Sequence, residues 1–547
     1  MDFIYTDFTF KYAPWPAYCL FNITTKATFN SMEISCWDVL ALSCFAALAF
    51  LFKLVTLLRS GGSNKFPPGP KPWPIIGNMN LIRPPPHRSF HKLSQKYGPL
   101  MQLKLGSVPV VIVASAEMAK QFLKDHDHIF CTRPQTAAGK YTGRNYSSFL
   151  WAPYGPHWRL WRKICQSELF SSKRLDSYEY IRMEEMKALM SSLYASLGKP
   201  IVLEKKLSCF TFSLMSRIVL GKRYFNDSRY NKSTLHVEEF KKMAQEFMKL
   251  HGAFNIGDWI PWLEFFDLQG YVRRMKTLVK NFDQFFDFVY DEHKVNRERE
   301  KDIFEPRNMA GLLLELMDDP NLDVKLTYDS VKALTQDLMV GGIETTSSTL
   351  EWAVSELIKH PHLIEKATEE LDKVVGRERW VEEKDIPQLP YIDAIMKETM
   401  RKHPASAMLP PHAALEDCEI GGFHIQQGSV VLVNTWSLGR DSRFWDCPEE
   451  FRPERFLGKE IDVKGNSFEL IPFGSGRRIC PGYNLALKMV SCGLANLLHG
   501  FKWRLPENMK TEDLSMEEGC GASAPRKVPL VAVLDRRLPI NLYQNVC

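Results

Sequence analysis

The chain has 547 residues, 45% of them hydrophobic and 24% charged, which is enough for one large enzyme domain or for two to three ordinary ones. Its formal net charge of +6 is small and dispersed, so nucleic-acid binding is not indicated. The 12 cysteines contain no CxxC pair and no regular spacing, which argues against a zinc site or a disulfide framework and fits a reducing compartment.

The first predicted element is an apolar segment at residues 39–58, VLALSCFAALAFLFKLVTLL. As a helix it would be about 30 Å long, enough to cross a bilayer, and Lys53 near its end can reach the lipid surface. Basic residues follow it, which favours a cytosolic location for the rest of the chain. We therefore expect a membrane anchor at 36–60. A cleaved signal peptide is the alternative, but no small-residue cleavage site follows the apolar run.

Two further segments flank this anchor. Residues 1–35 are expected to be an N-terminal extension, because Met32 is a second plausible start beside Met1. Residues 61–77 contain the sequence KFPPGPKPWPIIG, whose prolines predict an extended, stiff hinge rather than a helix or a ladder strand.

The remainder, residues 78–547, is predicted to be one large domain dominated by helices, because no repeat or low-complexity linker interrupts it. Apolar residues at intervals of three and four predict helices, and β-branched runs with turn residues predict short strands. The clearest helices are 273–299, 330–359 and 362–375, and the clearest strands lie within 99–115, 422–439 and 527–543.

Two of the helical segments carry conspicuous side chains. In WRLWRK, Trp158 and Arg162 lie one helical turn apart, and an arginine suits forked recognition of a carboxylate. An amphipathic basic helix is the alternative. In LMVGGIETTSSTLEW, the adjacent Gly341 and Gly342 each weaken a helix by about 1 kcal/mol and open space beside it, although a kinked core helix would look the same.

Charged residues recur further along. Glu398 and Arg401 in KETMRKHP lie three apart and can pair on one helix face, which by itself indicates only a surface ion pair. A later segment, PERF, contains Arg455, and His412 follows the sequence MLPP.

The segment PFGSGRRICPG surrounds Cys480 with glycines and arginines, unlike a packed core. Glycines at 474, 476 and 482 permit unusual turns and close approach to a flat ligand. A helical pattern starts at residue 483, so the helix N-terminus and Arg478 both favour a thiolate. Such a thiolate suits a nucleophile, a redox sensor or a metal ligand. No histidine lies in the loop to act as a base, and a single thiolate is well suited to haem iron.

The sequence FGSGRRICPG resembles the haem-binding signature of the cytochromes P450, F-x-x-G-x-R-x-C-x-G. The resemblance extends over about residues 65–543. It implies a mainly α cytochrome P450 fold with small β-sheets, preceded by an N-terminal transmembrane helix. It also implies haem b as the cofactor, with Cys480 as the axial ligand of its iron and with Phe473 and Arg478 in the cofactor site.

The same resemblance assigns the other motifs. Trp158 and Arg162 would face a haem propionate, and His412 would be another propionate partner. Glu344 and Thr345 would manage protons on the opposite face of the haem. The remaining three charged residues would form a buried structural network, in which loss of one member costs roughly 3–5 kcal/mol; they are Glu398, Arg401 and Arg455.

Several segments resemble plant enzymes of specialised metabolism, near a branch that contains homoterpene (trimethyltridecatetraene) synthases and flavonoid hydroxylases. We expect the pocket to be lined by residues 136–149, 338–342, 405–410 and 521–525. The last two contain mostly small residues, which favours an aliphatic or polycyclic substrate but also fits tight packing. The chain departs from the branch in both of these segments, so the branch predicts the chemistry more firmly than the substrate. A terpenoid is expected first and a flavonoid or another phenylpropanoid second.

The resemblance further implies an enzyme of the endoplasmic reticulum membrane, single-pass and facing the cytosol. No nucleotide-binding G-x-G-x-x-G follows a strand, so electrons would come from NADPH through a membrane-bound reductase. Arg477 is a candidate contact for an acidic reductase surface, or is simply solvated.

Two other functions remain open at this point. A haem-thiolate isomerase or dehydratase would need no external electrons, and a non-catalytic haem or sterol binding protein would need no proton relay. The adjacent Glu344 and Thr345 favour a monooxygenase over both.

Overall fold

The structure, a computed structural model, describes residues 65–224, 237–299 and 308–544, together with three isolated positions before residue 65. The chain divides into two units, residues 1–64 and 65–547. The extension predicted at 1–35 and the anchor predicted at 36–60 lie outside the described residues, those three positions aside. Within the described ranges, no helix combines the length and the apolar character that a membrane span requires.

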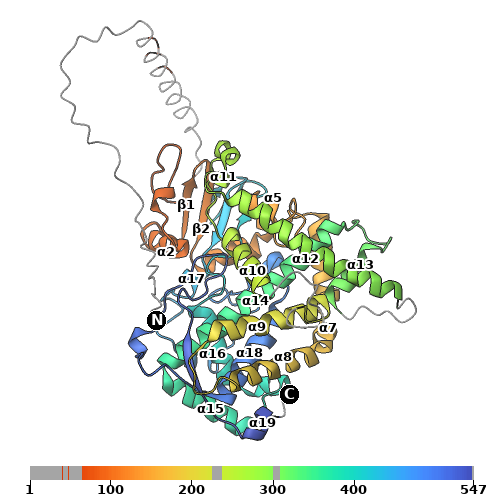
Figure 1. Cartoon of the computed structure of the whole chain (residues 1–547). Coiled ribbons are helices and arrows are strands. Elements are labelled where there is room, and N and C mark those ends of the chain that lie inside the picture. The colour runs from red at the N-terminus through yellow and green to blue at the C-terminus, as the bar shows by residue number, and fades with distance from the viewer. Residues whose placement is uncertain are drawn as a thin grey trace, which may run out of the picture. The chain divides into compact units, whose positions relative to one another are not determined.

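The helix α14 (Tyr328–Lys359) is the centre of the helical part, with three quarters of its residues buried. Its start is fixed by a capping box, in which Thr327 and Ser330 each accept a hydrogen bond from the other's backbone N–H. Among the helices that pack against it are α9 (Leu203–Met215), α15 (Pro361–Val374), α16 (Pro390–Lys402) and α18 (Tyr483–Gly500), and α8 (Glu179–Tyr194) packs in turn against α9 and α18 (Figure 1).

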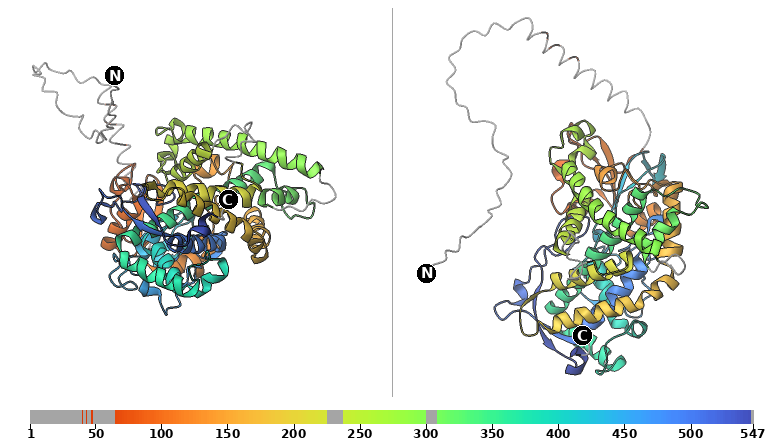
Figure 2. Two further views of the ribbon diagram at one scale, coloured as in Figure 1. Left: turned by 60° about the horizontal axis from the view of Figure 1, so that its bottom comes forward. Right: turned by 45° about the vertical axis from the view of Figure 1, so that its right-hand side comes forward.

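The other helices lie around this group. In both views of Figure 2, the long α12 runs along the surface. The longer ones are α2 (Pro86–Tyr97), α6 (Pro156–Ile164), α10 (Val237–His251), α12 (Tyr271–Arg299) and α13 (Met309–Met317). The short ones are α3 (Ala116–Lys120), α4 (Asp127–Phe130), α5 (Ala137–Tyr141), α7 (Ser172–Ser177), α11 (Ile256–Trp259), α17 (Thr435–Leu438) and α19 (Ile540–Gln544).

The strands form three small sheets in the described part of the chain. A four-stranded sheet has the order β1-β2-β7-β4, with β2 and β7 parallel and the other pairs antiparallel. Its strands are β1 (Leu100–Leu105), β2 (Val108–Val113), β7 (Val430–Val433) and β4 (His412–Ala413). A three-stranded sheet has the order β3 (Ile201–Val202), β9 (Val531–Arg536), β8 (Phe501–Arg504). The third sheet is the pair β5 (Cys418–Ile420) and β6 (Phe423–Ile425).

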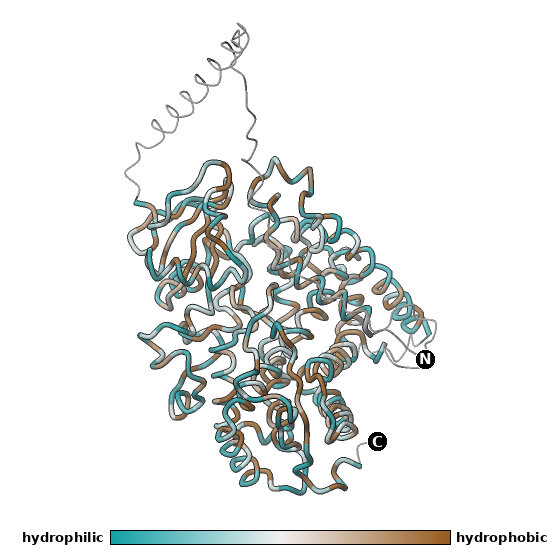
Figure 3. The backbone as a smooth tube through the Cα atoms, turned by 60° about the vertical axis from the view of Figure 1, so that its left-hand side comes forward, coloured by the Kyte–Doolittle hydropathy of each residue, from teal (hydrophilic) through white to brown (hydrophobic). Residues whose placement is uncertain are grey.

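The predicted mainly α fold with small sheets is confirmed. The segments predicted as strands also contain helices that were not expected, because Thr435–Leu438 and Ile540–Gln544 each form a short helical turn after a strand. Of the proline-rich segment, residues 65–72 form no helix or strand and lie along β1, where the Pro68 carbonyl accepts from Gln102 N–H at 2.9 Å. Residues 73–77 instead form a turn closed by a β-bridge between Trp73 and Gly77. Figure 3 shows hydrophobic stretches running through the interior and hydrophilic positions on the outer loops.

Candidate active site

The cysteine loop is held by its own backbone. Cys480 N–H donates to the carbonyl of Phe473 at 2.9 Å, three residues before α18 begins. Gly474 and Gly476 have φ of 74° and 67°, a region that glycine adopts without strain. A Cβ on Gly476 would lie 2.0 Å from the carbonyl oxygen of Leu123, so no larger residue fits. Gly482 differs from the expectation, because its φ of −91° is open to any residue.

The surroundings of Cys480 act on its pKa in opposite directions. Burial raises the pKa of its thiol, while the backbone N–H of Gly482 and the charge of Arg162 oppose this rise. Arg478, expected to stabilise the thiolate, points its guanidinium elsewhere. Among the described residues, no group of three or more His, Cys, Asp or Glu side chains could hold a metal ion, so a metal at Cys480 would need ligands from a prosthetic group.

Arg478 is buried and bonded to backbone carbonyls. Its Nε donates to Cys131 O and its Nη2 to Ala152 O, both at 2.6 Å, and its guanidinium lies 4.3 Å from the Trp158 ring centroid. Burial, with repulsion from Arg133, lowers the pKa of Arg478 to about 8. No carboxylate within the described ranges forms an ion pair with it.

Arg133, which the sequence motifs do not single out, lies beside it. Its Nη1 donates to the carbonyls of Pro410 and Pro411 at 2.8 and 2.9 Å, and its Nε donates to Leu150 O at 3.1 Å. Burial lowers the pKa of this guanidinium to about 9. Arg133 likewise has no carboxylate partner in the part of the chain that the structure describes. Its only signal in the sequence is an arginine before a proline in CTRPQ.

Trp158 and Arg162 lie on α6, next to the cysteine loop. Arg162 Nη1 donates to the carbonyl of Ile479, the neighbour of Cys480, at 2.7 Å. Trp158 is buried, and its indole Nε1–H has no hydrogen-bond partner among the described residues. A buried donor without a partner indicates an acceptor supplied by another molecule.

His412, on β4, completes this cluster. It is buried, and its Nδ1 lies 2.8 Å from the carbonyl of Phe130, so Nδ1 carries a proton. Burial, with repulsion from Arg133, lowers its pKa well below the ordinary value, which leaves the imidazole neutral.

These residues suit a flat group that bears carboxylates. Arg133, Arg162 and Arg478 bring three positive charges near one loop, and unpaired buried cations are costly unless a ligand supplies the counter-charge. Haem carries two propionates and an iron that a thiolate binds. The donor set therefore fits haem, with Cys480 toward the iron and the arginines toward the propionates.

The two glycines of α14 have different surroundings. A Cβ on Gly341 would find no heavy atom within 4 Å, so this position borders open space. A Cβ on Gly342 would lie 2.6 Å from the sulfur of Met215 on α9, so this glycine lets the two helices approach. Only Gly341 therefore opens space as expected, and α14 runs through both without interruption.

Thr345 and Glu344 lie beside that space. The Thr345 hydroxyl donates to the Gly341 carbonyl at 2.7 Å, which leaves its oxygen lone pairs free to accept. Glu344 accepts a hydrogen bond from the Ser523 hydroxyl at Oε1, while Oε2 is buried without a partner in the described residues. Burial raises the pKa of Glu344, and the Ser523 hydrogen bond opposes this rise.

The structure brings Glu398, Arg401 and Arg455 together. Glu398 is fully buried and accepts from Arg401 at 2.6 and 2.9 Å and from Arg455 at 3.1 Å. Arg401 also donates to carbonyls at 439, 448 and 450. The network therefore fixes the segment at 439–450, which precedes the cysteine loop.

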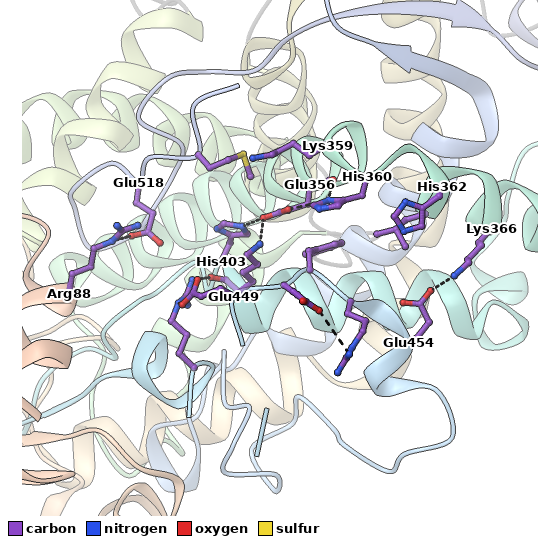
Figure 4. A pocket seen from close by; sticks show the side chains of 17 residues that line it. Arg88, Glu356, Lys359, His360, His362, Lys366, His403, Glu449, Glu454 and Glu518 are labelled. Atoms are coloured by element: carbon purple, nitrogen blue, oxygen red, sulfur yellow. Dashed lines mark hydrogen bonds and ion pairs between the residues drawn. The ribbon is translucent and has the colours of Figure 1, made fainter. Parts of the chain in front are cut away.

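The described part of the chain also contains two hollows with charged linings. One, of about 800 Å³, lies at the C-terminal end of α14, where each buried carboxylate faces a basic partner (Figure 4): Glu356 contacts His403 and Glu518 contacts Arg88. None of its lining residues belongs to the cysteine loop. The other, of about 700 Å³, lies between α6 and that loop. It is lined by five basic residues, Lys124, Arg159, Arg162, Lys163 and Arg477.

Comparison with known proteins agrees with this geometry. The family model of Cytochrome P450 matches residues 67–530. The chain is 43% identical to a trimethyltridecatetraene synthase of Zea mays, covering 92% of this chain and 96% of that protein. It is 44% identical to a flavonoid 3'-monooxygenase of Petunia hybrida, covering 92% and 99%.

A solved structure gives the same result. A zebra fish cytochrome P450, determined with abiraterone, superposes with a TM-score of 0.70 at 26% identity, covering 83% of this chain and all of that one. The matched family model spans most of the described unit, including α14 and the cysteine loop. The chain therefore belongs to the cytochrome P450 monooxygenase family.

Proposed function

We propose that this protein is an NADPH-dependent monooxygenase of the endoplasmic reticulum membrane that oxidises a lipophilic plant metabolite, a terpenoid before a flavonoid or another phenylpropanoid. Its reaction would insert one atom of dioxygen into a C–H bond and reduce the other to water, with two electrons from NADPH. The observation that carries the proposal is the half-buried Cys480 amid three guanidinium groups that have no carboxylate partner in the described part of the chain.

Each group of residues has a separate task. When bound, haem supplies the activation of dioxygen and the oxidising equivalent. Cys480 holds the iron, and Arg133, Arg162 and Arg478 hold the propionates and neutralise their charge. Trp158 donates its free Nε1–H to the same group. The hydroxyl oxygen of Thr345 accepts a hydrogen bond from a proton donor in the pocket. Glu344 delivers protons from the side of α14 that faces Ser523.

The small residues near α14 support an apolar substrate. Ala407 and Ala524 are buried together with Trp436, and Gly341 borders open space. Small apolar side chains of this kind suit an acyclic or polycyclic hydrocarbon skeleton rather than a charged molecule. Oxidation at one carbon would give hydroxylation, and repeated oxidation would give C–C cleavage.

The basic groove between α6 and the cysteine loop supports delivery of electrons by an acidic partner. Lys124, Arg159 and Lys163 are exposed there, and Asp127 is held by Arg477 at 2.8 Å. A flavoprotein reductase with an acidic face would be steered to this groove. Gly476 and Arg477 of the cysteine loop line the groove, and Arg162 connects it to the carbonyl of Ile479, so the path for electrons would be short.

Exposed aromatic and aliphatic side chains support contact with lipid. Two segments lie beside the turn between β1 and β2, since Gly106 N–H donates to Ile76 O and Ser107 N–H to Trp259 O. They expose the residues that we call the aromatic patch: Trp73, Ile75, Trp262, Phe265, Phe266 and Leu268. Phe265 is 90% exposed. Large aromatic side chains are favoured at membrane interfaces, so this patch would lie against the bilayer.

The proposal is tested by expression in microsomes with a plant-type reductase. We expect reduced protein with carbon monoxide to show the red-shifted Soret band of a thiolate ligand. Terpene alcohols and flavonoids are then supplied with and without NADPH, and products are read by mass spectrometry. Product without NADPH would identify an isomerase or dehydratase, and absence of any product with a normal spectrum would favour a binding protein.

A further inference from the structure

Ser523 lies in the connection between β8 and β9, where this connection passes α14. The loop is fixed on both sides of Ser523: Ala522 N–H donates to Met248 O and Ala524 N–H to Ala405 O, both at 2.9 Å. The indole of Trp352, on α14 itself, donates to the Ala524 carbonyl at 3.0 Å. The position of Ser523 is therefore set by three contacts that do not involve its side chain.

The hydroxyl of Ser523 donates to Oε1 of Glu344. Ser523 is buried, and Oε2 of Glu344 has no hydrogen-bond partner among the described residues. The Ser523 hydroxyl thus determines which way the carboxyl of Glu344 turns.

We propose that Ser523 is a positioning residue for the monooxygenase reaction, holding the carboxyl of Glu344 in the orientation from which it delivers protons along α14. The inference rests on the proposed function, and it adds the C-terminal loop to the proton supply. Position 523 therefore affects the coupling of oxygen reduction to product as well as the shape of the pocket.

The charges that face Glu344 are few. Glu204 on α9 disfavours its ionised form, Lys249 on α10 favours it, and the Ser523 hydroxyl is the direct hydrogen-bond donor. Burial already raises the pKa of Glu344. Removal of the hydroxyl takes away a hydrogen bond to the charged form, so the pKa of Glu344 must rise further.

The test compares the full-length wild type with Ser523→Ala, Ser523→Thr and Ser347→Ala in microsomes. The Ser347 hydroxyl donates to the backbone carbonyl of Glu344 at 3.1 Å and not to its carboxyl, which makes it a matched control. Infrared difference spectroscopy follows the carbonyl band of protonated Glu344, identified by its loss in Glu344→Gln. We expect its titration midpoint to rise by about one pH unit in Ser523→Ala and to stay unchanged in the control.

The second readout is the ratio of product to NADPH consumed, measured against pH. The pH midpoint of this ratio should rise in Ser523→Ala, as the infrared midpoint does, and should return toward the wild-type value in Ser523→Thr. In Glu344→Gln, adding Ser523→Ala should cause no further change. An unchanged infrared midpoint in Ser523→Ala, or an additive effect in the double variant, would overturn the inference. A wild type that forms no product from NADPH would refute the proposed function instead, and the infrared titration would still report on the contact.

Discussion

Arg133 and Arg478 are buried guanidinium groups whose hydrogen bonds go to backbone carbonyls. Carbonyl dipoles stabilise a cation only in part, so each arginine retains an unbalanced charge, and burial lowers the pKa of both. A bound dianion removes that imbalance. At the scale of single residues, the affinity for the prosthetic group therefore depends on these arginines as well as on the cysteine.

We expect Arg133→Gln to release haem about 10- to 100-fold faster than the wild type, because a charge-assisted hydrogen bond of roughly 1.5–3 kcal/mol is lost. Haem transfer to excess apomyoglobin gives the rate. Arg159→Gln, an exposed arginine on α6, is the control and should leave the rate unchanged. Equal rates in Arg133→Gln and the wild type would show that Arg133 does not hold a propionate.

The cysteine motif predicts which residues matter but not where each side chain points. Arg478 occupies its motif position, yet its guanidinium lies against Trp158, and Arg162 is the cation that acts on Cys480. Arg133 and Ser523 carry almost no signal, because one precedes a proline and the other lies among small residues. Their contacts join positions more than 170 residues apart, which no local pattern encodes.

At the scale of elements, helix periodicity predicts α12, α14 and α15 to within about two residues at each end, because long amphipathic or buried runs have one clear period. The turns α17 and α19 cannot be predicted in the same way, because each comes shortly after a strand and has only four or five residues, too few to show a period. The two adjacent glycines of α14 look equivalent in the sequence, and only packing against α9 distinguishes them.

That difference gives a test on one helix. Gly342→Ala forces a methyl group against Met215 at 2.6 Å, so we expect a loss of about 1–3 kcal/mol in stability, seen as a lower Tm. Gly341→Ala meets open space and should stabilise α14 by about 1 kcal/mol. In a double-mutant cycle, Gly342→Ala should cost less stability in a Met215→Ala background than in the wild type, because the contacting side chain is then absent. A larger loss of Tm in Gly341→Ala than in Gly342→Ala would contradict this assignment.

At the scale of the whole molecule, two buried carboxylates at the hollow in Figure 4 connect distant segments. Burial alone would raise the pKa of Glu356, but its hydrogen bond with His403 and the charge of Lys402 lower that pKa to about 2. Burial also opposes ionisation of Glu518, but its hydrogen bond with His87 and the charge of Arg88 lower its pKa to about 2. Both groups stabilise the fold only while they are ionised.

The pKa of each carboxylate is lower in the folded protein than in the unfolded chain. Each ionised carboxylate therefore adds up to about 3 kcal/mol to the free energy of unfolding above pH ~4.5, and this contribution is lost as the pH falls toward 2. We expect Glu356→Gln and Glu518→Gln to lower Tm at pH 7 and to flatten its decline between pH ~5 and ~3. Glu507→Gln, at an exposed position outside the hollow, should match the wild type. Thermal unfolding measured at a series of pH values decides this, and parallel curves for all variants would refute it.

The aromatic patch predicts how the unit contacts lipid. In nanodiscs that contain brominated lipid, Trp262 and Trp73 should be quenched, because each is 64% exposed on the patch. We expect Trp262→Phe in the full chain to lower the quenched fraction of fluorescence. Trp161→Phe removes a fully buried indole and should leave the quenched fraction unchanged or slightly higher. Identical quenching in wild type and Trp262→Phe would place the patch away from the membrane.

If the basic groove binds the reductase, reversing one of its charges should weaken electron transfer, whereas the same change at a solvated surface should have no effect. Lys163→Glu reverses one charge among five cations, so steering of an acidic reductase should weaken and the KM for reductase should rise about 10-fold at low salt. The rate at saturating reductase should change little, since no group that touches the cofactor is removed. The difference from wild type should shrink as salt rises toward 0.5 M, because exposed charges are screened within a few ångströms there.

Lys502→Glu makes the same change of charge on β8, outside the groove, and should leave the KM for reductase unaltered. If both variants raised the KM equally, net charge rather than the groove would control the encounter.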